Sequence, residues 1–424
     1  LFNTVQLFRQ HKDVLAHYQQ RFEHILIDEY QDTNMAQNEI VLKLASADDA
    51  NAQHNVCVVG DTDQSVYRFR GADFRNILQF ETAFPEVTVV VLAQNYRSTQ
   101  TILDAANAVI TNNAERKPKE LWTELGKGDR VVRFYADDEY HEANWAISQL
   151  KQMHESDARQ WREMAVFYRT NAQSRVLEES LMQSGVPYKV IGGTRFYDRR
   201  EVKDALAYIR CAANPLDEVS LKRILNVPKR GIGDTTVDRI DAFAASQQVS
   251  FALALRRATE AGVGGVGAKG IAAFVALIDD LESRLGQGPG SVLRHALEVS
   301  GYFKELEAED TVESAGRHEN LSELIGSASE FTQVDEFLEQ VALVADTDQI
   351  DSDNHVTLMT LHAAKGLEFP VVFIVGLEEG IFPHSRALTD QNELEEERRL
   401  AYVGITRAKE KLFLSHSWSR NLYG

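Results

Sequence analysis

Two adjacent carboxylates stand directly after a short apolar run near the start of the chain. Residues 25–27 are Ile-Leu-Ile, and Asp28, Glu29, Gln31 and Asp32 follow within five positions. A strand that ends in paired carboxylates suits a nucleotide hydrolase: the first carboxylate helps to hold Mg²⁺, and the second accepts a proton from the attacking water. The alternative is a solvated turn whose acids cap a helix, and the extended polar run makes that alternative weaker.

A neutral amide, Gln64, follows a second apolar run at 56–59 and a Gly-Asp turn. An amide in this position can hydrogen-bond both a phosphate oxygen and a water molecule. The competing interpretation is a turn glutamine that faces solvent.

Aromatic and cationic residues alternate just beyond this amide, at Tyr67, Phe69 and Arg70. Such interleaving suits single-stranded nucleic acid, because bases stack on rings and phosphates pair with arginine. Aromatics at this spacing are more often core packing, but their position directly after Gln64 favours the nucleic-acid interpretation.

These side chains need a framework, and the apolar pattern predicts α/β structure with an all-helical interruption. Continuous apolar runs are typical of parallel strands that are covered on both faces. We expect strands at 25–27, 56–59, 87–92, 131–135, 164–168, 188–191, 356–359, 371–375 and 412–414. We expect helices at 35–44, 143–153 and 174–184, the last stopped by Gly185 and Pro187. The stretch 201–351 reads as helical, with breaks at 231–233 and at 262–270, where the glycines predict a mobile loop.

Size and composition set outer limits. A chain of 424 residues with 44% hydrophobic content predicts two to four folded domains. No apolar run approaches the roughly 18 residues needed to span a bilayer, so we expect no membrane association. The two cysteines, Cys57 and Cys211, lie far apart, which predicts a buried thiol at Cys57 rather than a disulfide, and a cytosolic protein. The net charge of −19 argues against indiscriminate nucleic-acid binding but leaves room for local basic patches.

Five segments, taken in order, resemble the motifs of superfamily 1 DNA helicases of the PcrA/UvrD/Rep type. They are DEYQDTN (28–34), GDTDQSVYRFRGA (60–72), QNYRS (94–98), TLHAAKGLEF (360–369) and YVGITRA (402–408). One such match could arise by chance, whereas five in order form a specific signal. The resemblance extends over essentially the whole chain, since 168–171 and 192–210 are also similar to this family.

The resemblance implies an ATP-dependent 3′→5′ helicase that uses ATP and Mg²⁺ in DNA repair or replication. Its partners would be single-stranded DNA, junctions of single and double strands, and repair or replication proteins in the bacterial cytosol and nucleoid. The roles that it implies for nucleotide chemistry are catalysis by Glu29, Gln64, Arg97 and Arg407, a metal ligand at Asp28, and nucleotide contacts from Tyr96 and Glu368.

The DNA contacts that the resemblance implies are spread along the chain. They are Tyr67, Phe69, Arg70, Arg169, Asn171, His362, Lys365, His384, Lys229, Arg230, Gly231 and Gly233. Phe69 stands where the family usually has tryptophan, so stacking there is expected to be weaker. For 231–233, Gly-Ile-Gly would offer backbone N–H groups to a duplex phosphate, and a helix–helix turn that needs small residues is the alternative. A basic cluster at Arg195, Arg199, Arg200 and Lys203 either touches DNA or forms a solvated helix face.

The fold implied is two RecA-like parallel-sheet lobes, the first incomplete, with a helical domain inserted in the second. The expected first lobe is 1–94, in which 1–20 return from a helical domain inserted in that lobe. The second lobe is 95–200 with 352–424, and the DNA-contacting insertion is 201–351.

The family's phosphate-binding loop is missing from the sequence. The pattern Gly-x-x-x-x-Gly-Lys-[Ser/Thr] does not occur, because the one Gly-Lys pair, Gly126-Lys127, is followed by Gly128. We therefore expect a chain cut from a longer protein, with little or no ATP hydrolysis of its own. Two alternatives stay open: a non-catalytic DNA-binding or regulatory module, and the helicase part of a helicase–nuclease.

Overall fold

The chain divides into two compact units in the computed structural model, which describes residues 1–46, 55–114, 116–345 and 353–420. Unit 1 consists of Leu1–Tyr135, Glu163–Arg169 and Met359–His416, and unit 2 of Ala136–Arg162, Thr170–Leu358 and Ser417–Gly424. The domain boundary expected at 351/352 and the last four residues of the expected second lobe lie outside the described residues.

Short helices and two parallel strands make up the first part of unit 1. The elements are α1 (Phe2–Gln10), α2 (Lys12–Arg21), β1 (Ile25–Ile27), η1 (Tyr30–Asp32), α3 (Met35–Leu44), β2 (Val56–Val58), η2 (Thr62–Gln64), η3 (Arg68–Arg70) and α4 (Arg75–Ala83). β1 pairs with β2 in parallel, with Ile25 opposite Val56. A reciprocal capping box between Asn34 and Gln37 fixes the start of α3, as expected for a helix that begins just after a turn.

One face of this two-stranded sheet is packed and the other is open. Tyr30, Phe80 and Phe84 are buried together on the packed side. Leu26, at the centre of β1, is 79% exposed, and Cys57 on β2 is an exposed free thiol. The prediction of a buried Cys57 is therefore wrong, because no described segment covers this face of the strand.

The apolar run 87–92 was expected to be a strand, and that prediction is also wrong. The structure assigns it no strand, and Val89, Val90, Val91 and Leu92 are all exposed. Strand propensity depends on a partner for the backbone N–H and C=O groups and on a surface for the side chains. Val87 donates its backbone N–H to Phe84 and packs against the Tyr30 cluster, but the structure shows no paired strand along the run, and Val89 to Leu92 lack a covering surface among the described residues.

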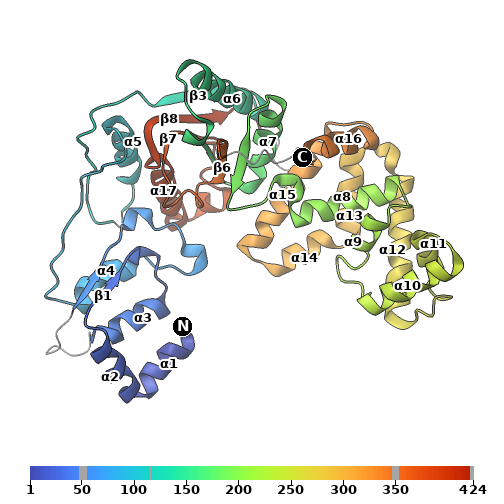
Figure 1. The fold of residues 1–424 in the computed structure, drawn as a ribbon, viewed down its shortest axis with the longest axis horizontal. Coiled ribbons are helices and arrows are strands. Elements are labelled where there is room, and N and C mark those ends of the chain that lie inside the picture. Colours follow the sequence, from blue (N-terminus) through green and yellow to red (C-terminus); the bar gives the residue numbers. More distant parts are fainter. Residues whose placement is uncertain (47–54, 115, 346–352, 421–424) are drawn as a thin grey trace. The chain divides into compact units, whose positions relative to one another are not determined.

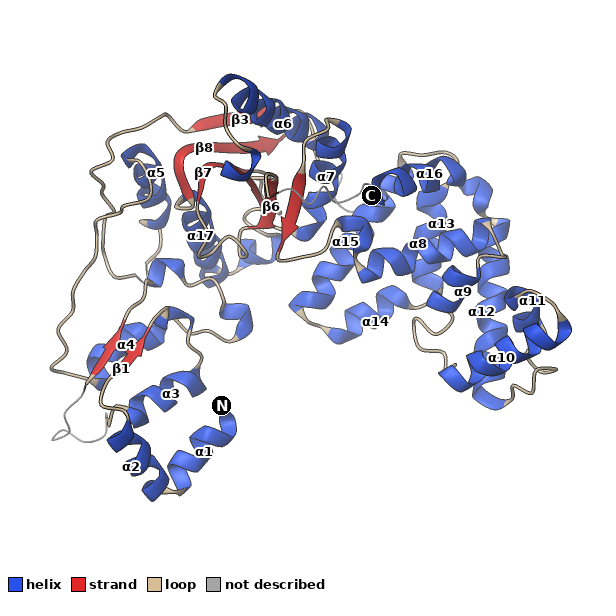
Figure 2. Cartoon of the chain, viewed as in Figure 1, coloured by secondary structure: helices blue, strands red, loops and turns tan. Residues whose placement is uncertain are grey.

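The second sheet has six strands in the order β3-β8-β7-β4-β6-β5. Figures 1 and 2 label β3, β8, β7 and β6 of this sheet. Their bounds are β3 (Val132–Ala136), β4 (Met164–Tyr168), β5 (Tyr188–Ile191), β6 (Val356–Thr360), β7 (Phe369–Ile374) and β8 (Ala408–Ser417). The pairings of β7 with β4 and with β8 are parallel. Every residue of β4 is buried, as expected for a central strand of an α/β sheet.

Two helices of unit 1 pack against this sheet. They are α5 (Gln100–Ile110) and α17 (Gln391–Ile405), and η8 (Ser385–Thr389) precedes the second of them. Ile102 of α5 and Leu400 of α17 share one buried cluster with Phe167 of β4 and Val372 of β7. This packing holds the strands in place, and ligands of α/β proteins bind at the loops that follow the carboxyl ends of such strands.

The described residues of unit 2 form mainly helices, together with β5, part of β6 and the last residues of β3 and β8. Its helices are α6 (Glu139–Ser156), η4 (Trp161–Glu163), η5 (Asn171–Gln173), α7 (Ser174–Gln183), η6 (Phe196–Asp198), α8 (Arg200–Ala213), α9 (Glu218–Ile224), α10 (Asp234–Gln247), α11 (Phe251–Arg256), α12 (Gly265–Ser283), η7 (Leu285–Gln287), α13 (Pro289–Val299), α14 (Tyr302–Glu309), α15 (Val312–Ser329) and α16 (Val334–Ala345). α7 ends at Gln183, and Gly185, two residues beyond, adopts the left-handed region (φ 65°), which confirms the predicted stop. One large apolar cluster, from Phe196 to Val344, fills the helical part.

The glycine tract at 262–270 was expected to be a mobile loop, and most of it is helix instead. α12 begins at Gly265, within the tract. Ile271 and Phe274 of the same helix are buried in the main cluster, so packing of the apolar face outweighs the low helix propensity of glycine. Among the described residues, no helix is both long and apolar enough to cross a membrane.

Candidate functional site

The predicted metal and base residues stand at the carboxyl end of β1. Asp28 and Glu29 are both exposed, and the Asp28 carboxylate accepts the backbone N–H of Glu29 at 2.8 Å. Glu29 has a φ of 51°, a left-handed conformation that non-glycine residues seldom adopt and that is common at functional sites. The side chain of Gln31 donates to Glu29 at 2.6 Å and so fixes the direction of the second carboxylate.

A lysine from a segment more than 300 residues downstream completes this cluster. The ammonium group of Lys365 pairs with Asp32, lies 3.3 Å from Glu29, and donates to the backbone oxygen of Gln64 at 2.8 Å. Burial raises the pKa of Asp32, and the hydrogen bond from Lys365 opposes that shift. Lys365, expected to contact DNA, thus has its ammonium group among carboxylates.

The side-chain amide of Gln64 has a defined orientation. Its NH₂ group donates to Asp61 at 2.8 Å, while its oxygen lies 3.5 Å from the guanidinium of Arg407. The structure therefore brings together three residues predicted to be catalytic, Glu29, Gln64 and Arg407, through one chain of contacts.

Arg407 is buried at the start of β8. Its guanidinium donates to the backbone oxygens of Val403 (3.0 Å) and Leu367 (3.4 Å). Burial, together with the nearby charge of Arg97, lowers the pKa of Arg407 to about 10. The group stays protonated at neutral pH, so the site keeps a desolvated positive charge beside Gln64, where negative charge is strongly favoured.

A pocket of about 400 Å³ lies next to this cluster, lined by Gln94, Asn95, Tyr96, Arg97, Glu368 and Lys409. The ring of Tyr96 is 79% exposed and so is free to stack on a planar group. Arg97 donates to Glu368 at 2.5 Å, and Lys409 lies 2.7 Å from the same carboxylate. Hydrogen bonds from Lys409 and Arg97 lower the pKa of Glu368 to about 2, so the carboxylate is ionised at neutral pH.

The predicted nucleic-acid side chains Tyr67, Phe69 and Arg70 are joined by His362. The Tyr67 and Phe69 rings are 6.1 Å apart, and the Arg70 guanidinium lies 5.3 Å from each. The His362 ring meets Phe69 edge-on at 5.4 Å. Burial and the charges of Arg169 and Arg70 lower the pKa of His362 to about 3, so its ring is neutral at physiological pH.

Two further predicted contacts share one carboxylate. Arg169 donates to Glu397 at 2.7 Å, and Glu397 also accepts the backbone N–H of His384 at 3.0 Å. The side chain of Arg169 is therefore held by an ion pair at the end of β4.

In unit 2 the residues predicted to contact DNA differ in their exposure to solvent. Asn171 has an exposed side chain, and its backbone oxygen accepts from Arg199 at 2.8 Å. Arg199 itself is buried, which excludes the solvated-face interpretation for that member of the basic cluster. Lys229 is exposed, as are Gly231 and Gly233.

The side chain of Arg230, by contrast, points into the helical part of unit 2. It donates to the backbone oxygens of Ile224, Leu225 and Pro228 and, at 2.6 Å, to the hydroxyl of Tyr208. This guanidinium stabilises the turn around 228–233. The exposed surface of that turn includes Gly231 and Gly233.

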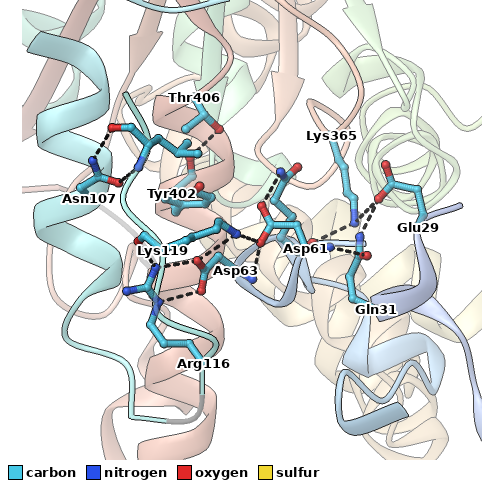
Figure 3. A network of polar contacts seen from close by, with 12 residues as sticks. Glu29, Gln31, Asp61, Asp63, Asn107, Arg116, Lys119, Lys365, Tyr402 and Thr406 are labelled. Atoms are coloured by element: carbon cyan, nitrogen blue, oxygen red, sulfur yellow. Dashed lines mark hydrogen bonds and ion pairs between the residues drawn. The ribbon is translucent and has the colours of Figure 1, made fainter. Parts of the chain in front are cut away.

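Several residues in and around the site were not predicted from the sequence. They are Lys409, Asn95 and Gln94 in the pocket, Glu397 beneath Arg169, and Arg116 and Lys119, which face the Asp61 and Asp63 carboxylates (Figure 3). Gln94, Asn95 and Lys409 lie inside or beside recognised motifs, so adjacency was an available signal. Arg116 and Lys119 lie in an irregular stretch that offers none.

Comparison with known proteins matches a helicase family model to each of two parts of the chain. A family model described as UvrD/REP helicase N-terminal domain matches residues 1–85, and one described as UvrD-like helicase C-terminal domain matches 90–261 and 274–419. The chain is 45% identical to the ATP-dependent DNA helicase PcrA of Bacillus subtilis, over 100% of the chain and 59% of that protein. It is 45% identical to the ATP-dependent DNA helicase UvrD1 of Mycobacterium tuberculosis, over 99% of the chain and 58% of that protein. The chain thus spans about three fifths of the length of these relatives, and it belongs to the UvrD-like helicase family.

Proposed function

We propose that this chain forms part of an ATP-dependent DNA helicase that moves along single-stranded DNA in the 3′→5′ direction, in repair or replication. The observation that carries the proposal is the chain of contacts from Glu29 through Lys365 and Gln64 to Arg407. It links the acidic cluster after β1 to the buried arginine just before β8, so a nucleotide bound there would contact both segments. The direction of movement rests on family membership.

In the proposed nucleotide site, the pocket beside Tyr96 takes the base and Glu368 binds the ribose. Glu29 accepts a proton from the attacking water, and Gln64 orients that water against the terminal phosphate. Arg97 and Arg407 stabilise the negative charge that develops on the transferred phosphate. Closure of the two cationic groups around ATP would couple hydrolysis to movement.

The acidic residues fit a divalent cation. Asp28 is an exposed carboxylate at the carboxyl end of a parallel strand, and Mg²⁺ binds to proteins through one or two carboxylates together with substrate phosphates. Asp28 would hold the ion. When bound, Mg²⁺ neutralises phosphate charge.

The DNA track proposed for unit 1 is the cluster of Tyr67, Phe69, Arg70 and His362. Rings stack on bases with little regard to sequence, and Arg70 supplies phosphate affinity. The proposal adds Arg169, Lys365 and His384 in the same unit, and Asn171 in unit 2, as further strand contacts.

Lys229, Arg230, Gly231 and Gly233 are proposed to serve the duplex side of a junction. The exposed Gly231 and Gly233 backbone and the Lys229 ammonium provide the contact surface, with Arg230 stabilising the turn from within. Backbone N–H groups at such a turn bind phosphate without reading bases.

The domain organisation that we propose for this function keeps residues 1–94 as a first RecA-like lobe, with 1–20 returning from a helical insertion. Residues 95–200 and 352–424 form a second lobe, and 201–351 form an inserted helical domain that contacts DNA. The boundary proposed at 94/95 is supported by the family models, because the first ends at residue 85 and the second begins at residue 90.

A second candidate is a DNA-binding module without catalysis. It is compatible with the exposed ring of Phe69 beside Arg70, which would bind single strands with or without ATP hydrolysis. Both candidates agree that this chain by itself hydrolyses ATP poorly or not at all.

The test compares the 424-residue chain with the full product of the native gene, each with and without Glu29→Gln. We expect DNA-stimulated ATP hydrolysis from the full product alone, and its loss in Glu29→Gln with DNA binding retained. If the full product binds single strands tightly yet hydrolyses no ATP, the non-catalytic module is the correct function. Robust hydrolysis by the 424 residues would contradict the role given to the missing loop.

A further inference from the structure

A basic pair, Arg116 and Lys119, lies against the turn that carries Gln64. Arg116 donates two parallel hydrogen bonds to the Asp63 carboxylate, of 3.0 Å from Nε and 2.8 Å from Nη2 (Figure 3). The Asp63 side chain is completely buried and that of Arg116 is 9% exposed, so this is a desolvated, bidentate ion pair. Breaking such a pair from one side leaves an uncompensated buried charge.

Lys119 completes the arrangement at the neighbouring carboxylate. Its ammonium group pairs with Oδ1 of Asp61 and lies 3.2 Å from Asp63. The same Oδ1 accepts the backbone N–H of Asp63 at 2.9 Å, while the other oxygen, Oδ2, accepts the side-chain NH₂ of Gln64 at 2.8 Å. Each oxygen of Asp61 thus has its own donors.

The segment that bears the basic pair is itself fixed. Asn107 of α5 exchanges two hydrogen bonds with the backbone of Leu121, at 2.9 and 3.1 Å. The Arg116 guanidinium also donates to the backbone oxygen of Lys119 at 3.1 Å. Since α5 packs on the six-stranded sheet, these two hydrogen bonds tie the irregular stretch that bears the two cations to the packed core.

Charge balance gives the pair a role beyond holding the fold. The turn 61–64 contains two carboxylates, and without compensation they would repel a triphosphate beside Gln64. Arg116 and Lys119 supply two positive charges. The pairing therefore neutralises the turn while leaving Asp61 Oδ2 as an acceptor for Gln64.

We propose that Lys119, supported by Arg116, is a positioning residue that sets the orientation of the Gln64 amide. By holding one oxygen of Asp61, Lys119 directs the other toward the Gln64 NH₂ group. The Gln64 oxygen then faces Arg407 at 3.5 Å, ready to accept from that guanidinium or from a water. This inference rests on the proposed function, because it assigns Lys119 an effect on ATP hydrolysis through Gln64.

The test is a double-mutant cycle on the full product of the native gene, read as kcat and KM for DNA-stimulated ATP hydrolysis. Lys119→Met keeps the aliphatic stem and removes the charge. We expect kcat to fall about tenfold, with KM for ATP changed less than about twofold, and Lys119→Arg to recover most of the loss. In a Gln64→Ala background, Lys119→Met should lower kcat by less than about twofold, because the group that it positions is already gone.

The matched control is Lys117→Met, two residues away, whose ammonium group pairs with the exposed Glu81. It should leave both constants unchanged. Circular dichroism melts of each variant show whether Lys119→Met has altered folding instead.

Three results would overturn the inference. A loss of kcat that is additive with Gln64→Ala would mean that Lys119 does not act through that amide. A rise in KM at constant kcat would give Lys119 a role in nucleotide affinity alone. If the unsubstituted protein shows no DNA-stimulated hydrolysis, the proposed function itself fails, and that outcome is distinct from the first two.

Discussion

The guanidinium of Arg97 lies 2.5 Å from the carboxylate of Glu368, although the two residues are 271 positions apart. Both are proposed to touch the nucleotide, the first at the phosphate and the second at the ribose. In the structure the two side chains neutralise each other. If ATP binds as proposed, Arg97 has to leave Glu368 to reach the phosphate, and Lys409, at 2.7 Å from the same carboxylate, can then keep the charge of Glu368 compensated.

Arg97→Ala should lower kcat for DNA-stimulated ATP hydrolysis by about 10³-fold, as is typical when an arginine that stabilises a transferred phosphate is removed. KM for ATP should change little, because the charge that Arg97 meets develops in the transition state. Steady-state kinetics of the full gene product measure both.

Arg75→Ala is the control, since Arg75 is exposed and pairs locally with Asp73. A tenfold or greater rise in KM for Arg97→Ala with unchanged kcat would show that Arg97 serves ground-state binding only.

The sequence was most informative where chemistry follows directly from a strand end. The placement of Glu29 and Gln64 at one edge of a sheet could be predicted because each follows an apolar run, and the parallel pairing of β1 and β2 brings their loops to that edge. Phe69 and His362, 293 residues apart, could be grouped only through the family resemblance, and the structure brings their rings to 5.4 Å.

Features that depend on long-range packing could not be predicted. Lys119 lies in a stretch without periodicity, so nothing local indicates that it faces Asp61. The run 87–92 has high strand propensity, but propensity cannot show whether a neighbouring strand is present. The glycines of 262–270 suggested a loop because burial of Phe274, which stabilises the helix, cannot be inferred from composition.

Phe69→Ala should weaken binding of single-stranded DNA by the 424-residue chain. The Phe69 side chain is 46% exposed, and a base stacked on an aromatic ring contributes about 1–3 kcal/mol, which corresponds to a roughly 5- to 150-fold change in Kd. Phe69→Trp should bind at least as tightly as the unsubstituted chain, because indole offers the larger stacking surface. Fluorescence anisotropy with a labelled oligo-dT measures the change.

Phe2→Ala provides a comparison, since Phe2 is an exposed aromatic far from this cluster in the sequence. Equal losses for Phe2→Ala and Phe69→Ala would point to a general effect of surface aromatics and remove Phe69 from the DNA track.

His362 should make the fold sensitive to acid. Its pKa falls from the ordinary value of 6.5 to about 3 in the folded protein, because of burial and of the charges of Arg169 and Arg70. Between these values the unfolded chain takes up a proton that the folded chain does not, so the free energy of unfolding decreases as pH falls below 6.5. For one such group the slope is at most about 1.4 kcal/mol per pH unit.

Urea titrations of the 424-residue chain at pH 5, 6 and 7 test this expectation. His362→Gln should show a smaller loss of stability on acidification, while His17→Gln, at an exposed position, should behave like the unsubstituted chain. Identical slopes for all three proteins would rule out His362 as the source of acid sensitivity.

Glu178 should produce the opposite dependence on pH. This carboxyl group of α7 is buried, which raises its pKa to about 7, even though it accepts the Phe196 backbone N–H at 3.2 Å. The folded chain keeps the proton between pH 4.5 and 7, whereas the unfolded chain loses it. The free energy of unfolding therefore falls as pH rises through that window and then stays level.

Glu178→Gln removes the ionisation while keeping an oxygen that can accept the Phe196 N–H. We expect the variant to match the unsubstituted chain near pH 4.5 and to exceed it at pH 8 by up to roughly 3 kcal/mol, since each pKa unit corresponds to about 1.4 kcal/mol. Glu313→Gln, at an exposed position on α15, controls for the loss of a negative charge from an acidic protein. A Glu178→Gln variant that is less stable at pH 8 than at pH 4.5, relative to the unsubstituted chain, would mean that the ionised carboxylate is stabilised by its neighbours Ser174 and Arg199 more strongly than burial penalises it.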